Sequence, residues 1–451
     1  MNAYRDFGPF DGKIWLNVAS EGPVPHTAME ALKDAVEWKL QPFQLTVSKF
    51  LGVPQQLRQA IGNLIHADPH DIILGNSATY GINLLANGLT LVQGDEVLLM
   101  QNDFPTNLLP WMALRKKGVQ VRELKPNGHV LTLDEIKAAV TPSTKVLCLS
   151  WVHTFTGHKI DPVAIGNFCR EKGVIFVLNC SQAIGAFSVD IAALPVDAVV
   201  CAGYKWLLGP YGTGFCWMKQ EVREKLQYNS AYWQTVLDEQ QLNSTDPVGS
   251  FELKTARHYD VFGTANFFNY VPWTASINYL GKIGMDKVTQ YNQQLVGMII
   301  DGIDKNQFKI ISPTEPAARS NLVVFSHQDP HNNAALMNKL KDMGIFLAFW
   351  KGMLRASPHI HNTRNDIDRF IKVLNSCLNT QNERTNPNTN VPKTEAPKTD
   401  AIKTDVQRND ISKSDASKID AAEDDVPEND VRENDVAEND VPESGISKTD
   451  E

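Results

Sequence analysis

One lysine stands in a segment whose residue types could do covalent chemistry. Lys205 follows the apolar residues 196–201 and precedes a loop with glycines at positions 209, 212 and 214. The apolar run predicts a buried strand, so Lys205 would lie at a strand end, where burial makes a charged ammonium costly. A neutral amine there can attack an aldehyde and form a Schiff base. A lysine that buries only its stem would give the same pattern, so the rest of the chain must decide between the two.

Two other segments contain residue types suited to a phosphate and a planar ligand. Residues 75–83 run from a strand end into a helix, and the free N–H groups at a helix start favour a phosphate. An ordinary N-cap accounts for Ser77 equally well. Residues 177–185 place Asn179 and Gln182 just after another predicted strand, with side chains that can donate and accept hydrogen bonds.

Short apolar runs alternate with helical patterns through the first half of the chain. This alternation predicts βαβ units and an α/β fold with a mainly parallel sheet buried on both faces. Ligands of such sheets bind at the carboxyl ends of the strands, which is where the segments above fall. The strands are expected at residues 71–75, 96–100, 119–124, 145–150, 174–178 and 196–201.

The pattern divides the chain into four parts. An N-terminal arm (1–25) precedes a large domain (26–305) and a smaller C-terminal α+β domain (306–378). Residues 379–451 contain no aromatic residue and, from residue 392, fall into five-residue polar units such as PENDV. Such a composition cannot bury enough apolar surface to offset the entropy of ordering, so a disordered low-complexity tail is expected.

Charge and cysteine content indicate which classes of partner and which compartment to expect. Residues 392–451 carry eight basic and eighteen acidic side chains, so the remainder of the chain is close to neutral. Nothing therefore indicates a nucleic-acid or membrane partner. The six cysteines are scattered without a CxxC pair, which predicts buried thiols in a reducing compartment and no metal site. The first residues lack a signal pattern and no apolar run approaches a membrane span, so a cytoplasmic protein is expected.

Taken in order, these segments resemble the class V aminotransferase family of pyridoxal-phosphate enzymes, which includes cysteine desulfurases, kynureninase and isopenicillin N epimerase. The resemblance covers about residues 12–375 and begins with WLNVASEGPVP at residues 15–25. It implies fold type I, with a large domain around a mainly parallel sheet and a smaller C-terminal α+β domain. It also implies pyridoxal 5'-phosphate as cofactor, an amino acid as the small-molecule substrate and a homodimer with shared active sites.

The resemblance also implies a role for each candidate site residue. Lys205 would form the internal aldimine and act as the base at Cα. Arg355 would hold the substrate carboxylate, although a surface ion pair is the alternative for a lone arginine. Thr264, in Gly-Thr-x-Asn, would reach the phosphate of the neighbouring subunit. His153 and Tyr204 are candidates for a second acid, or else structural residues. The other implied contacts are Ser77 and Ala78 with the phosphate, Phe104 stacked on the ring, Asn179 with the ring nitrogen, Gln182 with the phenolic oxygen, Tyr204 beside the lysine and Thr154 with the substrate.

Departures from the family pattern narrow the reaction. Asn179 stands where the family usually has an aspartate, and a neutral amide makes the ring a weaker electron sink. Phe104 replaces a stacked histidine and cannot exchange protons. The mobile cysteine of desulfurases is absent, because none lies between Cys216 and Cys377. We therefore expect an epimerase-like reaction or β-elimination by a C–S lyase rather than a desulfurase. An aminotransferase proper and a non-catalytic pyridoxal-phosphate regulator or scaffold stay open as alternatives.

Overall fold

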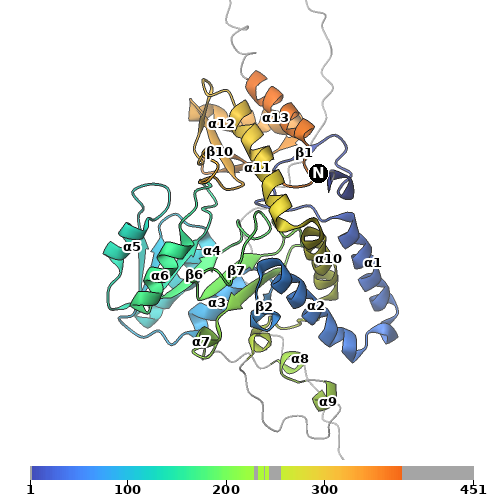
Figure 1. The fold of residues 1–451 in the computed structure, drawn as a ribbon, viewed down its shortest axis with the longest axis vertical. Helices are drawn as coiled ribbons and strands as arrows, with labels where there is room; N and C mark the ends of the chain where they lie inside the picture. The colour runs from blue at the N-terminus through green and yellow to red at the C-terminus, as the bar shows by residue number, and fades with distance from the viewer. Residues whose placement is uncertain (1–2, 228–231, 238, 243–254, 378–451) are drawn as a thin grey trace, which may run out of the picture. The chain divides into compact units, whose positions relative to one another are not determined.

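The structure is a computed structural model that describes residues 3–227, 232–237, 239–242 and 255–377. The expected disordered tail at residues 379–451 lies outside the described residues. Within the described part, Figure 1 shows a large sheet-centred region followed by a smaller one, and α11 (Met285–Gly302) leads from the first to the second.

A seven-stranded sheet forms the centre of the large region. The strand order is β2-β8-β7-β6-β5-β3-β4, and the neighbours from β7 to β4 pair in parallel. Strand β8 runs antiparallel to both of its neighbours. This mainly parallel sheet confirms the expected fold class. The strands are β2 (Ile72–Gly75), β3 (Glu96–Met100), β4 (Gln120–Leu124), β5 (Thr144–Ser150), β6 (Ile175–Asn179), β7 (Ala198–Ala202) and β8 (Gly214–Met218).

Both faces of this sheet are covered, because successive side chains of a strand point to opposite faces. In β3, Leu98 and Met100 pack into one apolar cluster, whereas Val97 and Leu99 pack into another. Burial on both faces explains why the strands appear in the sequence as continuous apolar runs. The first cluster includes side chains of α2 (Val47–Ile65) and α10 (Phe267–Ile283), and the second includes side chains of α3 (Ala78–Gly88) and α4 (Pro105–Met112).

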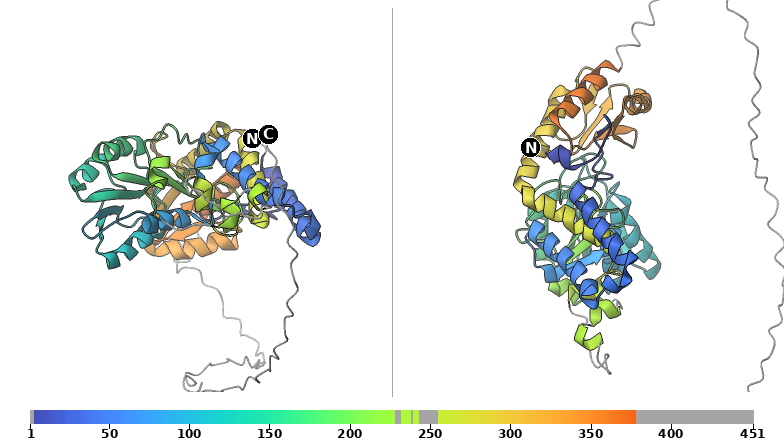
Figure 2. Two further views of the ribbon diagram at one scale, coloured as in Figure 1. Left: turned by 90° about the horizontal axis from the view of Figure 1, so that it is seen from below. Right: turned by 90° about the vertical axis from the view of Figure 1, so that its right-hand side faces the viewer.

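Helix α6 (Pro162–Lys172) of this region shows how capping residues set the ends of a helix. It begins after Asp161, whose carboxylate accepts hydrogen bonds from two backbone N–H groups, and it ends at Gly173 with a positive φ of 66°. Aspartate is a preferred N-cap residue, and glycine is preferred where a helix ends in the left-handed conformation. Helix α1 (His26–Leu40) packs against α10, as Figures 1 and 2 show. The other helices here are α5 (Leu133–Ala139), α7 (Gln220–Arg223), α8 (Trp233–Val236) and α9 (Glu239–Leu242).

The smaller region is built on an antiparallel sheet of order β12-β13-β10-β9. Its core includes the buried rings of Phe308, Phe325 and Phe370. The N-terminal strand β1 (Ile14–Trp15) pairs in parallel with β11 (Ile345–Phe346), so the arm is joined to this region. The other elements are β9 (Phe308–Ile310), β10 (Val323–His327), β12 (Ala348–Trp350), β13 (Met353–Ala356), α12 (Asn333–Asp342) and α13 (Arg364–Ser376).

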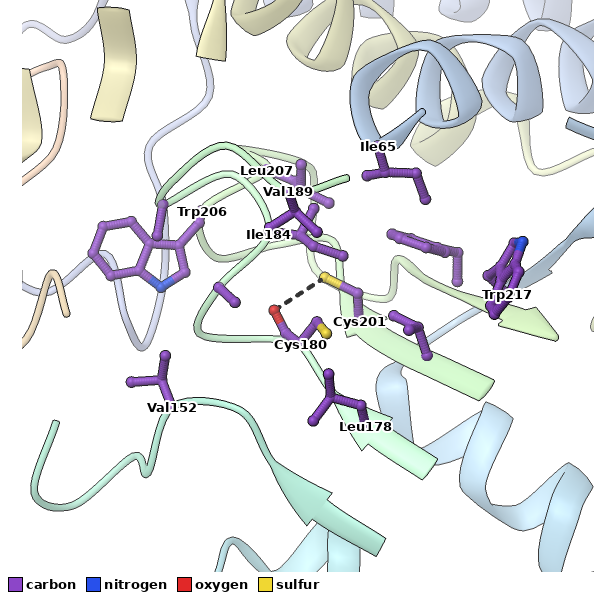
Figure 3. Packing of buried hydrophobic residues seen from close by; sticks show 14 of the residues in the cluster. Ile65, Val152, Leu178, Cys180, Ile184, Val189, Cys201, Trp206, Leu207 and Trp217 are labelled. Carbon is purple, nitrogen blue, oxygen red and sulfur yellow. Dashed lines mark hydrogen bonds between the residues drawn. The ribbon is translucent and has the colours of Figure 1, made fainter. Parts of the chain in front are cut away.

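The apolar core continues directly beneath the loop that carries Lys205. Figure 3 shows Trp206 and Leu207 of this loop among buried side chains, with the Cys201 thiol 3.9 Å from the carbonyl oxygen of Cys180. All six cysteines are buried and free, as expected from their apolar surroundings in the sequence. In the described part of the chain, no helix combines the length and apolar character needed to cross a membrane.

Candidate active site

The carboxyl ends of three neighbouring parallel strands open on one pocket. The last residues of β5 and β6, Ser150 and Asn179, are paired in register, and β7 ends beside them at Ala202. The start of α3 and the loop after β3 close the other walls. Eight of the ten expected site residues line this pocket: Ser77, Ala78, Phe104, Thr154, Asn179, Gln182, Tyr204 and Lys205.

Lys205 is buried at the strand end where the sequence placed it. Its side chain is only 7% exposed, and no acidic side chain in the described residues forms an ion pair with it. Burial, together with the positive charge of Arg355, lowers the pKa of Lys205 to about 8. Its Nζ atom lies 5.2 Å from the centre of the Phe104 ring. An amine with this pKa is neutral in a useful fraction of molecules near physiological pH, which is the form that attacks an aldehyde.

The start of α3 offers the hydrogen-bond donors that suit a phosphate. Ser77 is the N-cap, and its hydroxyl accepts a hydrogen bond from the N–H of Tyr80 at 3.3 Å. The first N–H groups of a helix have no intrahelical partner and lie at the positive end of its dipole. Gly214 allows the close approach of β8, because a Cβ at this position would lie 2.6 Å from the Ser77 backbone. Ser77 thus serves as an N-cap at a helix start that can also bind an anion.

Arg355 is a buried guanidinium whose bonded partners are all neutral. It is 2% exposed, and its Nη1 atom donates to the carbonyl oxygen of Thr154 at 3.1 Å. Its Nη2 atom donates to Ser20 Oγ at 2.8 Å and to Asn17 Oδ1 at 3.4 Å. The Nε atom has no partner among the described residues, and burial lowers the pKa of Arg355 to about 10. The surface ion pair considered from sequence is therefore wrong, and the guanidinium has capacity for a carboxylate.

Gln182 and Tyr204 are held in place by the arm and by neighbouring aromatic rings. Gln182 donates from Nε2 to the carbonyl oxygen of Ala19 at 2.9 Å, and its Oε1 accepts from Trp206 Nε1 at 2.8 Å. The second N–H of its amide has no partner in the part of the chain that the structure describes, so it is available to a ligand. Burial raises the pKa of Tyr204 to about 12, with smaller contributions from Tyr211 and nearby acidic groups. Tyr204 therefore keeps its proton at neutral pH.

Three candidate residues do not line the pocket: Arg355, described above, and Thr264 and His153. The Thr264 hydroxyl donates to the carbonyl oxygen of Val261 at 2.6 Å, and Thr264 lines a different cavity. Its expected contact with a phosphate in a neighbouring subunit stays a prediction. Both ring nitrogens of His153 are used, by the carbonyl oxygen of Asn102 at 3.0 Å and by Thr156 Oγ1 at 2.8 Å. These bonds favour a structural role for His153 over a role as second acid.

Several residues of the site were missed by sequence reasoning. Ser20 and Asn17 reach Arg355 from the arm, although more than 330 residues separate them in sequence. Asp103 and Asn107 flank Phe104 in a segment that was singled out for Phe104 alone, and Asn107 bonds directly to Asn179 at 2.8 Å. The recurrence of polar residues in an otherwise apolar stretch is a signal that could have found Asp103 and Asn107. Asn17 and Ser20 lie in the motif at residues 15–25 with which the family resemblance begins, but that motif alone does not connect them to Arg355.

Residues 44–370 match the class-V aminotransferase family, so the chain belongs to that family of pyridoxal-phosphate-dependent enzymes. Its cofactor is pyridoxal 5'-phosphate. The pocket fits this group, since it combines a buried amine for the aldehyde, a helix start for the phosphate and polar side chains between them.

Similar proteins differ in their named reactions. The chain is 26% identical to a probable cysteine desulfurase of Methanothermobacter thermautotrophicus over 80% of this chain and 94% of the relative. It is 23% identical to an isopenicillin N epimerase of Amycolatopsis lactamdurans, again over 80% and 94%. The solved structure of the cystine C–S lyase C-DES with cysteine persulfide matches with a TM-score of 0.74 and 21% identity, over 82% of this chain and 98% of that one. This last likeness concerns the fold alone.

Proposed function

We propose that the protein is a pyridoxal-phosphate-dependent lyase that removes a β substituent from an amino acid. The observation that carries this proposal is the pair of buried cations Lys205 and Arg355, neither of which has an ion-pair partner in the described residues. Thr154 connects them, because it lines the Lys205 pocket and its carbonyl oxygen accepts from Arg355. An amine for an aldehyde beside a guanidinium for a carboxylate matches an α-amino acid substrate.

When bound, pyridoxal phosphate supplies an aldehyde that condenses with amino groups and a ring that withdraws electrons from Cα. The chain supplies the rest of the chemistry. Arg355 would hold the α-carboxylate and thereby fix which Cα bond faces Lys205. Lys205 Nζ would take the Cα proton, for which its lowered pKa is suited, because a base works best when its pKa is near the operating pH. Loss of the β substituent as an anion would then balance the electrons left by that proton.

The side chains around the pocket favour one base over two. A two-base epimerisation needs a proton-exchanging group on the face of Cα opposite Lys205. Phe104, which the family resemblance would place over the cofactor ring, has no exchangeable proton, and both His153 nitrogens are bonded elsewhere. β-Elimination needs only one base at Cα, so it accords better with this set of side chains.

The cysteines argue against a persulfide-forming desulfurase. Such an enzyme needs an accessible thiolate to receive sulfur. All six thiols are buried, and burial raises the pKa of Cys201, the one that lies beside Lys205 in the field of its charge, to about 12. None of the six is an accessible thiolate that could attack a bound substrate.

Epimerisation is the second candidate, and Tyr204 is the observation that favours it. Its hydroxyl keeps its proton, lines the pocket and belongs to the residue next to Lys205. It could return a proton to Cα if it reaches the second face. The relatives named isopenicillin N epimerase support keeping this reaction in the test. Transamination is less well supported, because the neutral Asn179 offers no charge to strengthen the ring as an electron sink.

A panel of amino acids separates these reactions. The purified holoprotein should release pyruvate and ammonia from L-cysteine, L-cystine or β-chloro-L-alanine. Cα proton exchange with inversion, detected by chiral chromatography in deuterated water, would instead establish epimerisation. Transfer of the amino group to an added keto acid would establish an aminotransferase. Absence of all three, in a protein that binds the cofactor, would contradict the enzyme proposal and favour the regulator or scaffold.

The role of Lys205 has a direct chemical test. Borohydride reduction and peptide mass mapping should place a pyridoxyl group on Lys205. Lys205→Ala should carry no reducible label and lose the proton-abstraction step. Lys219→Ala is a matched control, because Lys219 is a partly buried lysine at the end of β8 that pairs with Asp197 at 2.9 Å, away from the pocket. A label on any lysine other than Lys205 would overturn the assignment.

A homodimer with shared sites is proposed on the placement of Thr264. Its side chain lies in a cavity that also includes Arg58 and Asp260, and it does not line the pocket of its own chain. Analytical ultracentrifugation should give a dimer. Thr264→Val should weaken phosphate retention while the Lys205 attachment remains. A monomer that retains full cofactor affinity would contradict this proposal.

A further inference from the structure

A buried carboxylate near the pocket has no cationic partner in the described residues. Asp103 is 3% exposed and lies just after β3, in the loop that leads into α4. Its two oxygens accept four hydrogen bonds, from Phe104 N at 2.7 Å, Asn107 Nδ2 at 2.9 Å, Ser150 N at 2.9 Å and Ser150 Oγ at 2.7 Å. Four donors satisfy both oxygens of the carboxylate without an ion pair. The carboxylate can only accept, so it dictates which atoms its neighbours turn toward it.

Asn107 transmits that constraint to the next residue. Its side chain is fully buried, and the two N–H groups of Nδ2 are used by Asp103 Oδ2 and by Ser150 Oγ at 2.8 Å. A rotated amide would place Oδ1 against the carboxylate, two acceptors in contact, which burial makes costly. Asn107 Oδ1 is therefore fixed on the opposite side, where it faces Asn179.

Two hydrogen bonds fix the orientation of the Asn179 amide. Its Nδ2 donates to Asn107 Oδ1 at 2.8 Å, and its Oδ1 accepts from the backbone N–H of Ser181 at 3.0 Å. A backbone N–H can only donate, so both contacts select the same orientation of the amide. One N–H of Nδ2 has no partner among the described residues, and Asn179 lines the pocket. The free group that Asn179 presents is thus a hydrogen-bond donor.

We propose that Asp103 and Asn107 are positioning residues that make Asn179 a donor to the ring nitrogen of the cofactor and keep that nitrogen unprotonated. The inference rests on the proposed function only in taking Asn179 as the residue that meets the ring. A nitrogen that accepts an N–H cannot also carry a proton, so the ring withdraws electrons as a neutral pyridine. The chain of hydrogen bonds from Asp103 to Asn179 is hereafter called the amide relay.

The amide relay makes an unusual prediction for Asn179→Asp. A carboxylate at this position would meet Asn107 Oδ1, which Asp103 does not allow to turn away. The new carboxyl group therefore keeps its own proton, and the ring nitrogen stays unprotonated. Adding Asp103→Asn removes the constraint, because an amide that turns its Nδ2 toward Asn107 can donate to Asn107 Oδ1. The Ser150 N–H then loses its acceptor, which is part of the stability lost by this substitution. Asn107 can then turn its N–H groups toward the new carboxylate, which ionises and stabilises a protonated ring.

The holoprotein is tested with nitrogen-15-labelled pyridoxal phosphate. The nitrogen-15 resonance should have the position of a neutral pyridine in the wild type and in Asn179→Asp. It should move upfield to the position of a pyridinium in the double variant Asp103→Asn with Asn179→Asp. A pyridinium signal in the wild type would overturn the proposal. A pyridinium signal in Asn179→Asp alone would show that the amide relay does not govern position 179. The wild-type spectrum tests the proposal even if a variant fails to fold.

The apoprotein gives an independent test that involves no cofactor. In a double-mutant cycle, the melting temperature lost in the double variant should be several degrees less than the sum of the two single losses. Asp197→Asn with Asn179→Asp is the control, because Asp197 caps the start of β6 through Phe176 N at 2.9 Å and does not touch the relay. Its losses should add. Additive losses for Asp103 and Asn179 would refute the relay while leaving the proposed reaction standing, whereas failure of cofactor attachment at Lys205 would refute the reaction alone.

Discussion

Two buried arginines of this protein differ in their partners, since one forms an ion pair and the other contacts only neutral groups. Arg58, on α2, forms an ion pair with Asp260, whose other oxygen accepts from Leu74 N at 2.8 Å. Arg355, on β13, contacts only neutral oxygens and leaves Nε without a partner among the described residues. A buried charge without a partner is costly, so a protein keeps one where a ligand will supply the opposite charge. The contrast supports the proposal that Arg58 holds structure, whereas Arg355 is reserved for the substrate carboxylate.

The largest effect should come from breaking the structural pair. Asp260→Ala leaves the Arg58 guanidinium buried without its carboxylate, which should lower the free energy of unfolding by about 3–5 kcal/mol. Urea denaturation of the apoprotein measures it. In the same assay Arg355→Met should leave the free energy of unfolding unchanged or raise it, since it removes a charge that has no partner. A similar loss in both variants would erase the contrast.

A smaller, pH-dependent effect is expected for Lys205. Its pKa is about 8 in the folded chain and 10.5 in the ordinary exposed state. Below pH 8 both states hold the proton, and the buried charge should cost about 3 kcal/mol relative to Lys205→Met. Between pH 8 and 10.5 the folded state releases its proton first, so the stability of the wild-type apoprotein should rise relative to the variant. Parallel pH profiles in the two proteins would argue against a buried amine.

Arg355→Lys should affect binding rather than stability. A lysine keeps the charge but loses the planar fork, which should cost about 1.5–3 kcal/mol in kcat/KM, mostly through KM. Steady-state kinetics with the substrate found in the amino acid panel measures the loss. Arg319→Lys is the matched control, because Arg319 bonds Gln293 Oε1 at 2.7 Å in the smaller region, away from the pocket. Equal kinetics in all three proteins would remove Arg355 from the substrate site.

The smallest effect should come from an exposed pair. Lys33 and Glu30 on α1 lie 2.8 Å apart with both side chains about two-thirds exposed. Solvent screens such a pair, so Lys33→Ala should change the free energy of unfolding by less than about 0.5 kcal/mol. Thermal denaturation at low and high salt measures this. A loss comparable to that of Asp260→Ala would show that burial does not explain why the Arg58–Asp260 pair matters more than an exposed pair.

The sequence alone predicted six of the seven strands of the large sheet and the residues at their ends, but not β8 (Gly214–Met218). Strand ends carry Asn179 and Lys205, and their positions follow from local apolar runs and from the rule that parallel strands end at one edge. The partners of these residues could not be predicted in the same way. Asn107 meets Asn179 across 72 positions, and Ser20 meets Arg355 across 335. Such contacts depend on packing between elements, which periodicity does not encode.

The segments that surround Arg355 also constrain the order in which a nascent chain can become active. The arm residues Asn17 and Ser20 leave the ribosome before the large sheet does, and their partner on β13 is made more than 330 residues after them. Contacts of this sequence separation form late, because a long loop must close before they contribute. The sheet that carries Lys205 can be translated completely before Arg355 on β13 is made. With the proposed roles of Lys205 and Arg355, a nascent chain would acquire its cofactor while still unable to bind the carboxylate of an amino acid. Incomplete enzymes would then not turn over substrate during translation.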